Sequence, residues 1–102
     1  MSQIRNIDVP MEKIAEFCRR WKVRRFSLFG SVLRDDFGPD SDVDVLVSLQ
    51  PDSTWDLLDL VDMRDELTAL FGREVDLVEE EGLRNPFRRS SILSTRQVVY
   101  VA

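Results

Sequence analysis

Two stretches of the chain carry apolar side chains at helical spacing. Ile14, Phe17, Cys18 and Trp21 recur at i, i+3, i+4 and i+7, which predicts an amphipathic helix that Asp8 caps and Pro10 begins. A longer stripe predicts a second helix over residues 55–71, with Ser53 or Thr54 as its cap and Gly72 as its end. We expect its buried stripe to be Leu57, Leu60, Val61, Leu67 and Phe71.

Shorter apolar runs with alternating polar positions predict strands. They cover residues 25–29, 43–49 and 74–78, and residues 98–101 form either a fourth short strand or an extended tail. A helical turn at 32–34, a loop at 35–41 and a last helix at 84–93, with Pro86 in its first turn, complete the chain. This order predicts the α/β (α+β) class: a small mixed sheet of three or four strands with helices packed against it.

Composition narrows the kind of protein. The 102 residues predict a single domain, 1–102, and 43% hydrophobic residues are enough for a packed core. No apolar run approaches the ~18 residues of a membrane span, and the first residues lack the apolar stretch of a signal peptide, so we expect a cytoplasmic protein. The lone Cys18 is expected in the core, and the absence of histidine excludes a Ser-His-Asp triad, a Cys-His pair and histidine metal ligation.

Charge is distributed unevenly along the chain. Residues 1–39 carry a net charge of +3, residues 40–82 carry −12 from fourteen acidic and two basic side chains, and residues 83–102 carry +4. The acidic middle argues against general nucleic-acid binding, which needs a continuous positive surface. It suits either a site that collects cations or a surface that meets a basic partner, although most of these carboxylates are expected on solvated helix faces.

A candidate phosphate site follows the first predicted strand. Gly30 and Ser31 lie between a strand and a helical turn, where free backbone N–H groups bind phosphate. Gly30 allows close approach of the backbone, the Ser31 hydroxyl can donate, and the Arg34 guanidinium lies one turn further along. Arg84, Arg88 and Arg89 are further phosphate-binding candidates, but we expect them on a solvated helix face.

Three aspartates provide a candidate metal site. Asp42 and Asp44 are two residues apart, so on a strand both carboxylates point to the same face. Asp76 interrupts an otherwise apolar strand and joins them if the second and third strands are neighbours. Magnesium favours such oxygen ligands together with substrate phosphates. The set predicts a site for two Mg²⁺ ions and in-line phosphoryl transfer, whereas each motif alone is also typical of an ordinary turn or a solvated strand end.

These motifs resemble a known family. Residues 29–34, Phe-Gly-Ser-Val-Leu-Arg, and 41–47, Ser-Asp-Val-Asp-Val-Leu-Val, are similar to the signature of the minimal nucleotidyltransferases, within the polymerase-beta-like nucleotidyltransferase superfamily. The resemblance covers nearly the whole chain and implies the nucleotidyltransferase fold. It implies that Gly30 and Ser31, with Arg34 and Ser41 from the extended pattern, bind the nucleotide, that Asp42, Asp44 and Asp76 bind metal, and that Asp76 activates the incoming hydroxyl.

The resemblance also implies a partner. Minimal nucleotidyltransferases pair with small helical HEPN proteins, usually ribonuclease toxins, and as antitoxins they transfer AMP from ATP to a toxin tyrosine. We therefore expect an Mg²⁺-dependent protein adenylyltransferase in a hetero-oligomer with a HEPN toxin, and no membrane partner. Two alternatives stay open: an antitoxin that neutralises its partner by binding alone, and nucleotidyl transfer to a small molecule or a nucleic acid, the latter disfavoured by the acidic middle.

Overall fold

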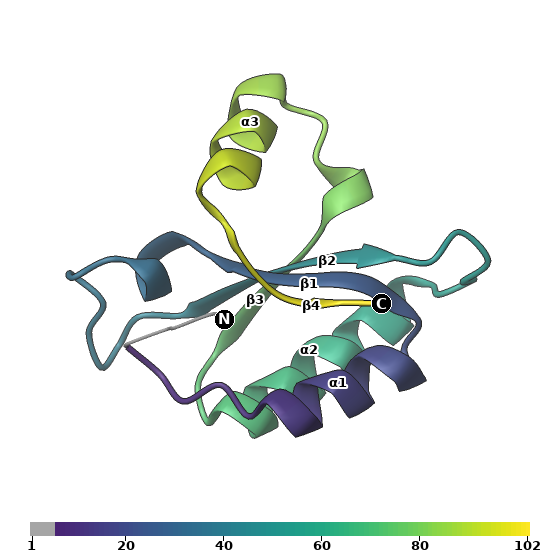
Figure 1. Cartoon of the computed structure of the whole chain (residues 1–102), viewed down its shortest axis with the longest axis horizontal. Helices are drawn as coiled ribbons and strands as arrows, with labels where there is room; N and C mark the ends of the chain where they lie inside the picture. Colours follow the sequence, from purple (N-terminus) through teal and green to yellow (C-terminus); the bar gives the residue numbers. More distant parts are fainter. Residues whose placement is uncertain (1–5) are drawn as a thin grey trace.

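The computed structural model describes residues 6–102 and has a four-stranded mixed sheet at its centre (Figure 1). The strand order is β3-β2-β1-β4; β1 runs antiparallel to both β2 and β4, and β2 runs parallel to β3. In chain order the elements are α1 (Met11–Arg20), β1 (Val23–Phe29), the 3₁₀ turn η1 (Gly30–Leu33), β2 (Val43–Leu49), α2 (Leu57–Phe71), β3 (Val75–Glu79), the 3₁₀ turn η2 (Glu80–Gly82), α3 (Pro86–Thr95) and β4 (Gln97–Val101).

The main core lies between the sheet and the α1/α2 layer. Alternation along the strands sends Val43, Val45 and Val47 of β2 to this face, where they meet apolar side chains of both helices. Phe17 of α1 packs edge-on against Phe26 of β1, with ring centroids 6.1 Å apart. The fully buried residues of this main core include Ile14, Phe17, Cys18, Val23, Phe26, Leu28, Val45, Met63 and Leu67. The prediction that Cys18 fills the core is confirmed.

Within residues 6–102, the opposite face of the sheet is covered by α3 and η2 (Figure 1). A small apolar cluster forms there from Phe29, Leu46, Leu83 and Ile92. Beside it, the largely buried Glu80 accepts a 2.8 Å hydrogen bond from Arg96. The α3 face is therefore held by a few apolar contacts and an ion pair that is shielded from water.

The fold class, the sheet and the helices agree with the sequence prediction, and two helix starts do not. Pro10, not Asp8, occupies the N-cap position of α1, without any side-chain capping hydrogen bond. Asp56, rather than Ser53 or Thr54, caps α2, because Asp56 and Asp59 form a reciprocal capping box. Gly72 ends α2, as predicted, and it adopts the left-handed conformation at φ +69°.

The predicted buried stripe of α2 is partly wrong. Leu67 is buried, and Leu60 and Phe71 pack against the core, but Leu57 and Val61 lie on the solvent side. Met63 takes the buried position instead, because the helix faces the sheet through positions 60, 63 and 67. Residues 97–101 resolve the question of the tail, since they form strand β4 beside β1.

No helix in the part of the chain that the structure describes is long and apolar enough to span a bilayer.

Candidate active site

The turn from β1 into η1 brings the backbone of Gly30 against the carboxylate of Asp44. Gly30 has φ +76°, a conformation that L side chains rarely adopt. A Cβ placed on Gly30 would lie 2.1 Å from Oδ2 of Asp44. Glycine is therefore required here for two independent reasons, the backbone conformation and the space that Asp44 occupies.

The strand pairing places the three predicted aspartates at one end of the sheet. Asp44 faces Asp76 directly in the parallel β2–β3 register, and Asp42 precedes β2 by one residue. Neighbouring positions 43, 45, 75 and 77 pack against the helical layer, so Asp44 and Asp76 point to the α3 face. β2 and β3 are neighbouring strands, as the prediction for Asp76 required, and their register places Asp76 beside Asp44.

Like charges and burial act together on Asp44. Partial burial raises the pKa of its carboxyl, and the negative charges of Asp76 and Asp42 raise it further, while Arg34 and Arg88 oppose the shift. Both effects disfavour the ionised form of Asp44. A cation beside this carboxylate would favour that form.

Two arginines approach this site from different elements. Arg34 follows η1, and its Nε donates to Oδ1 of Asp36 at 3.1 Å. Arg88 lies in the first turn of α3 and lowers the pKa of Asp44 through its charge. The sequence predicted Arg88 on a solvated helix face, and its side chain is exposed. Because α3 packs on the same face of the sheet as Asp44, the charge of Arg88 also acts on that carboxylate.

Ser31 and Ser41 occupy different environments. Ser31 is half-buried in η1, and its carbonyl accepts from the Arg34 N–H. The Ser41 hydroxyl accepts a 3.0 Å hydrogen bond from the Gly38 N–H, and Arg73 donates to the carbonyls of both Gly38 and Ser41 at 2.9 Å. Ser41 is therefore engaged in holding the loop that leads into Asp42, and its predicted contact with nucleotide stays a prediction.

A cleft of about 410 Å³ opens between η1 and α3, directly beside Gly30. Its size falls in the range of ~300–1,000 Å³ that small-molecule sites occupy. Its walls combine apolar and polar side chains from the two elements, namely Phe29, Leu33 and Arg34 with Ser91, Ile92 and Thr95. Sequence reasoning missed the α3 wall, whose only local signal is the i, i+4 spacing of Ser91 and Thr95.

The donor set fits magnesium bound together with a nucleotide. Within residues 6–102, no three carboxylates converge closely enough to hold a metal ion by themselves. Magnesium usually binds through one or two carboxylates and completes its shell with substrate phosphates and water. Asp42 and Asp44 offer hard oxygen ligands next to the Gly30 backbone, where phosphates would lie, so the residues present suit such a shared ion.

Comparison with known proteins identifies the family. Residues 11–99 match the model of the nucleotidyltransferase domain family, and this chain belongs to that family. It is 36% identical over 86 residues to protein adenylyltransferase MntA of Thermococcus cleftensis, covering 84% of this chain and 82% of that protein. A Methanocaldococcus jannaschii protein, provisionally named a protein adenylyltransferase, is 33% identical over 101 residues, 99% of this chain and 97% of that protein.

Solved structures share the fold. One assigned to the minimal nucleotidyltransferases has a TM-score of 0.70 at 36% identity, covering 85% of this chain and 86% of that chain. A chain in the crystal structure of a toxin–antitoxin with AMP-PNP has a TM-score of 0.74 at 20% identity, covering 92% of this chain and 75% of that chain. A chain in the complex of tri-AMPylated Shewanella oneidensis HEPN toxin with its MNT antitoxin has a TM-score of 0.65 at 20% identity, covering 90% and 70%.

Proposed function

We propose that this chain is a protein adenylyltransferase that transfers AMP from ATP, with Mg²⁺, to a tyrosine hydroxyl of a HEPN toxin and thereby acts as its antitoxin. Membership of the nucleotidyltransferase family and relatives named for protein adenylylation support this function. The observation that carries it is the contact between Gly30 and Asp44, because it joins a backbone phosphate cradle to a charged carboxylate.

Each site residue has a role in this proposal. The N–H groups of Gly30 and Ser31 bind the triphosphate at the start of η1, and Arg34 and Arg88 balance its negative charge. Asp42 and Asp44 would hold Mg²⁺, which would supply positive charge that stabilises the phosphates during the transfer. The cleft between η1 and α3 accommodates the nucleoside.

The reaction is an in-line displacement at the α-phosphorus. Asp76 accepts the proton of the acceptor tyrosine as the oxygen attacks. The bond between the tyrosine oxygen and the α-phosphorus forms while the bond from that phosphorus to the bridging oxygen breaks, and pyrophosphate leaves. Asp76 is suited to this role because it lies next to Asp44 yet is exposed, so an acceptor from solvent can reach it.

The test combines the full chain, Mg²⁺ and ATP with the product of the adjacent gene, which this proposal expects to be a HEPN protein. With ATP labelled at the α-phosphate, we expect label on the HEPN protein, and with γ-labelled ATP we expect none. Asp42→Asn should abolish the transfer, whereas Asp8→Asn, at an exposed aspartate before α1, should leave it unchanged. Absence of label with a competent HEPN protein would contradict the proposed function, and full transfer by Asp42→Asn would contradict the assigned site.

Neutralisation by binding alone is the competing function, and the exposed Leu57 and Leu58 of the acidic α2 favour it. The double variant Asp42→Asn with Asp44→Asn separates the two functions in a growth assay with the HEPN protein. Loss of protection supports transfer. Full protection by this variant supports binding alone.

A further inference from the structure

The start of α2 exposes more apolar surface than its own fold uses. Leu57 and Leu58 are 75% and 73% exposed, and Val61 is 36% exposed. Burying these side chains in a partner would remove apolar surface from water, which favours association. Asp56 and Asp59 already cap this end of the helix, so the leucines are not needed for capping. We call the residues Leu57, Leu58, Val61 and Leu77 the α2 patch.

A groove runs through this patch. It has a volume of about 190 Å³ and is lined from α2 and β3 by Leu57, Leu60, Val61, Arg64, Leu77 and Glu79. β3 is an edge strand, so no further strand from the described part of the chain covers this side of the sheet. The groove therefore has an apolar floor from two elements and is open to a partner.

The surroundings of the patch are acidic. Asp62 and Asp65 follow Leu58 along the helix at i+4 and i+7, and Glu79 lines the groove from β3. Arg64 also lines the groove, but it pairs with Asp65 at 3.5 Å, while Asp62 has no ion-pair partner within residues 6–102. An apolar floor with a negative rim fits a partner surface that combines apolar side chains with lysine or arginine.

The patch is separated from the candidate active site. Asp44 and Asp76 lie near the starts of the parallel strands β2 and β3 and point to the α3 face. α2 begins after the end of β2 and packs on the other face, so the start of α2 lies toward the opposite end of the sheet (Figure 1). Leu77 follows Asp76 in β3 but packs on the helical face. A protein bound at the patch would leave the carboxylates free.

We propose that the α2 patch is the docking surface for the protein acceptor, which binds it through an apolar segment flanked by basic side chains. This inference rests on the proposed function for the identity of the acceptor. A folded acceptor needs about 800 Å² of contact on each side, far more than a single tyrosine at the catalytic carboxylates provides. The patch supplies apolar surface for such contact on the face of the sheet away from the catalytic carboxylates.

Binding without chemistry is the direct test. The full chain is titrated with the HEPN protein from the neighbouring gene, in EDTA and without ATP, so that no transfer occurs. We expect the double variant Leu57→Ser with Val61→Ser to weaken binding at least tenfold. Met11→Ser, which removes a 45% exposed apolar side chain at the start of α1, is the matched control and should stay within twofold of wild type.

Charge reversal tests the rim. Asp62→Lys should weaken binding several-fold at low salt, and the difference from wild type should shrink at high salt because ions screen exposed charges. In the transfer reaction, Leu57→Ser with Val61→Ser should raise KM for the HEPN protein and leave kcat unchanged. Asp44→Asn should instead lose the transfer of AMP while it keeps the binding constant for the HEPN protein.

Four results decide between the alternatives. Wild-type affinity of the double variant would overturn the docking proposal, and so would failure of the wild-type chain to bind the HEPN protein. A self-association of the chain that the double variant abolishes would assign the patch to a second copy and also overturn it. Weakened binding by the double variant in a chain that never transfers AMP would support docking and contradict the proposed function alone.

Discussion

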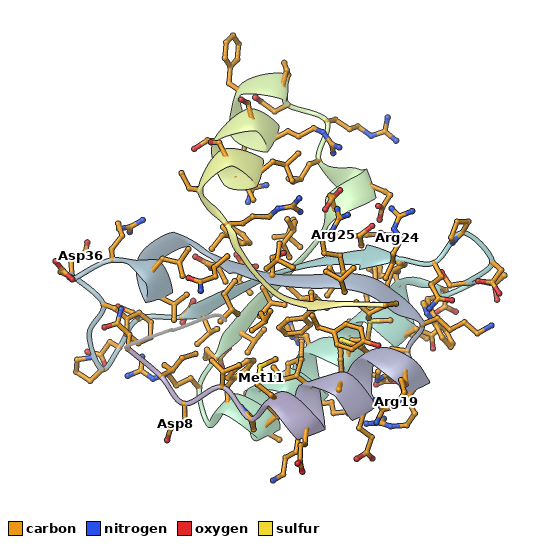
Figure 2. All side chains as sticks on the ribbon, in the orientation of Figure 1. Asp8, Met11, Arg19, Arg24, Arg25 and Asp36 are labelled. Atoms are coloured by element: carbon orange, nitrogen blue, oxygen red, sulfur yellow. The ribbon has the colours of Figure 1, made fainter. Side chains whose placement is uncertain are left out.

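The two faces of the sheet differ in what holds them. The face under α1 and α2 is a continuous apolar core that includes Phe17, Phe26 and Leu67, all fully buried. The α3 face has a much smaller apolar cluster, a shielded Glu80–Arg96 ion pair and the candidate catalytic carboxylates. Figure 2 shows the same division, with Arg24 and Arg25 directed toward the α3 side.

The small sheet supports a charged site because its two faces are built from the same strands. Alternation along β2 sends Val43, Val45 and Val47 to one face and Asp44 and Leu46 to the other, so each strand contributes to both faces. Close packing on the helical side fixes the strands, which in turn fix Asp44 opposite Asp76 although their charges repel. Stability is therefore expected to depend mainly on one face and activity on the other.

The largest effect on stability is expected in the helical face. Phe17→Ala should lower the free energy of unfolding by about 3–5 kcal/mol, because it leaves a cavity between α1 and β1. Phe87→Ala is the matched control: Phe87 is 84% exposed on α3, and its removal should change stability by less than about 0.5 kcal/mol. Both are measured by denaturant unfolding, and similar losses for the two variants would contradict the division between the faces.

Gly30→Ala should damage both stability and activity. The new Cβ would clash with the Asp44 carboxylate and force an alanine into positive φ, at a cost of about 1–3 kcal/mol. It should also displace Asp44 and abolish AMP transfer. Gly82→Ala is the control, since a Cβ there meets nothing within 4 Å. A Gly30→Ala variant with normal AMP transfer and normal stability would contradict the close contact between Gly30 and the Asp44 carboxylate.

Asp44→Asn should leave stability unchanged or increase it in EDTA at pH 7. The pKa of Asp44 is raised by burial and by Asp76 and Asp42, so the ionised carboxylate disfavours the folded state once the pH rises above that pKa. An amide of the same size removes this charge. Thermal unfolding of the two proteins side by side measures the effect. A marked loss of stability in the variant would show that the carboxylate is structurally required.

A small loss of stability is expected at Glu66, on the outer side of the helical layer. A hydrogen bond from Arg20 holds the pKa of Glu66 below its usual value, and Trp21 adds a second hydrogen bond at 3.1 Å. This stabilisation is present at pH 7 and is lost as the pH falls through the lowered pKa. Glu66→Gln should therefore unfold slightly more easily at pH 7, and the difference should shrink in acid. A difference that persists unchanged at low pH would contradict this reasoning.

The sequence predicted best what depends on local pattern. Gly30, Ser31, Asp42 and Asp44 belong to one strand–turn–strand segment, and their spacing alone indicated a phosphate and metal site. Asp76 was found because a charge interrupts an apolar strand, and the parallel β2–β3 register then places it beside Asp44. Their roles in binding nucleotide and metal remain predictions.

The errors lie where tertiary contacts decide. Several polar residues before α2 were plausible caps, and the reciprocal bonds of Asp56 and Asp59 select one that pattern alone could not rank. The exposure of Leu57 and Val61 depends on which side of α2 meets the sheet. The charge of Arg88 acts on Asp44 because α3 packs against this face of the sheet through Ile92, and no local sequence pattern encodes that packing.

The transfer of labelled AMP by Asp44→Asn tests most directly whether the charged face carries the chemistry while the apolar face carries the fold. We expect a variant that melts at or above the temperature of the wild type and transfers AMP to the HEPN protein at least about a hundredfold more slowly, because it loses several kcal/mol of charge stabilisation. Transfer at the wild-type rate by the folded variant would contradict this division between the two faces.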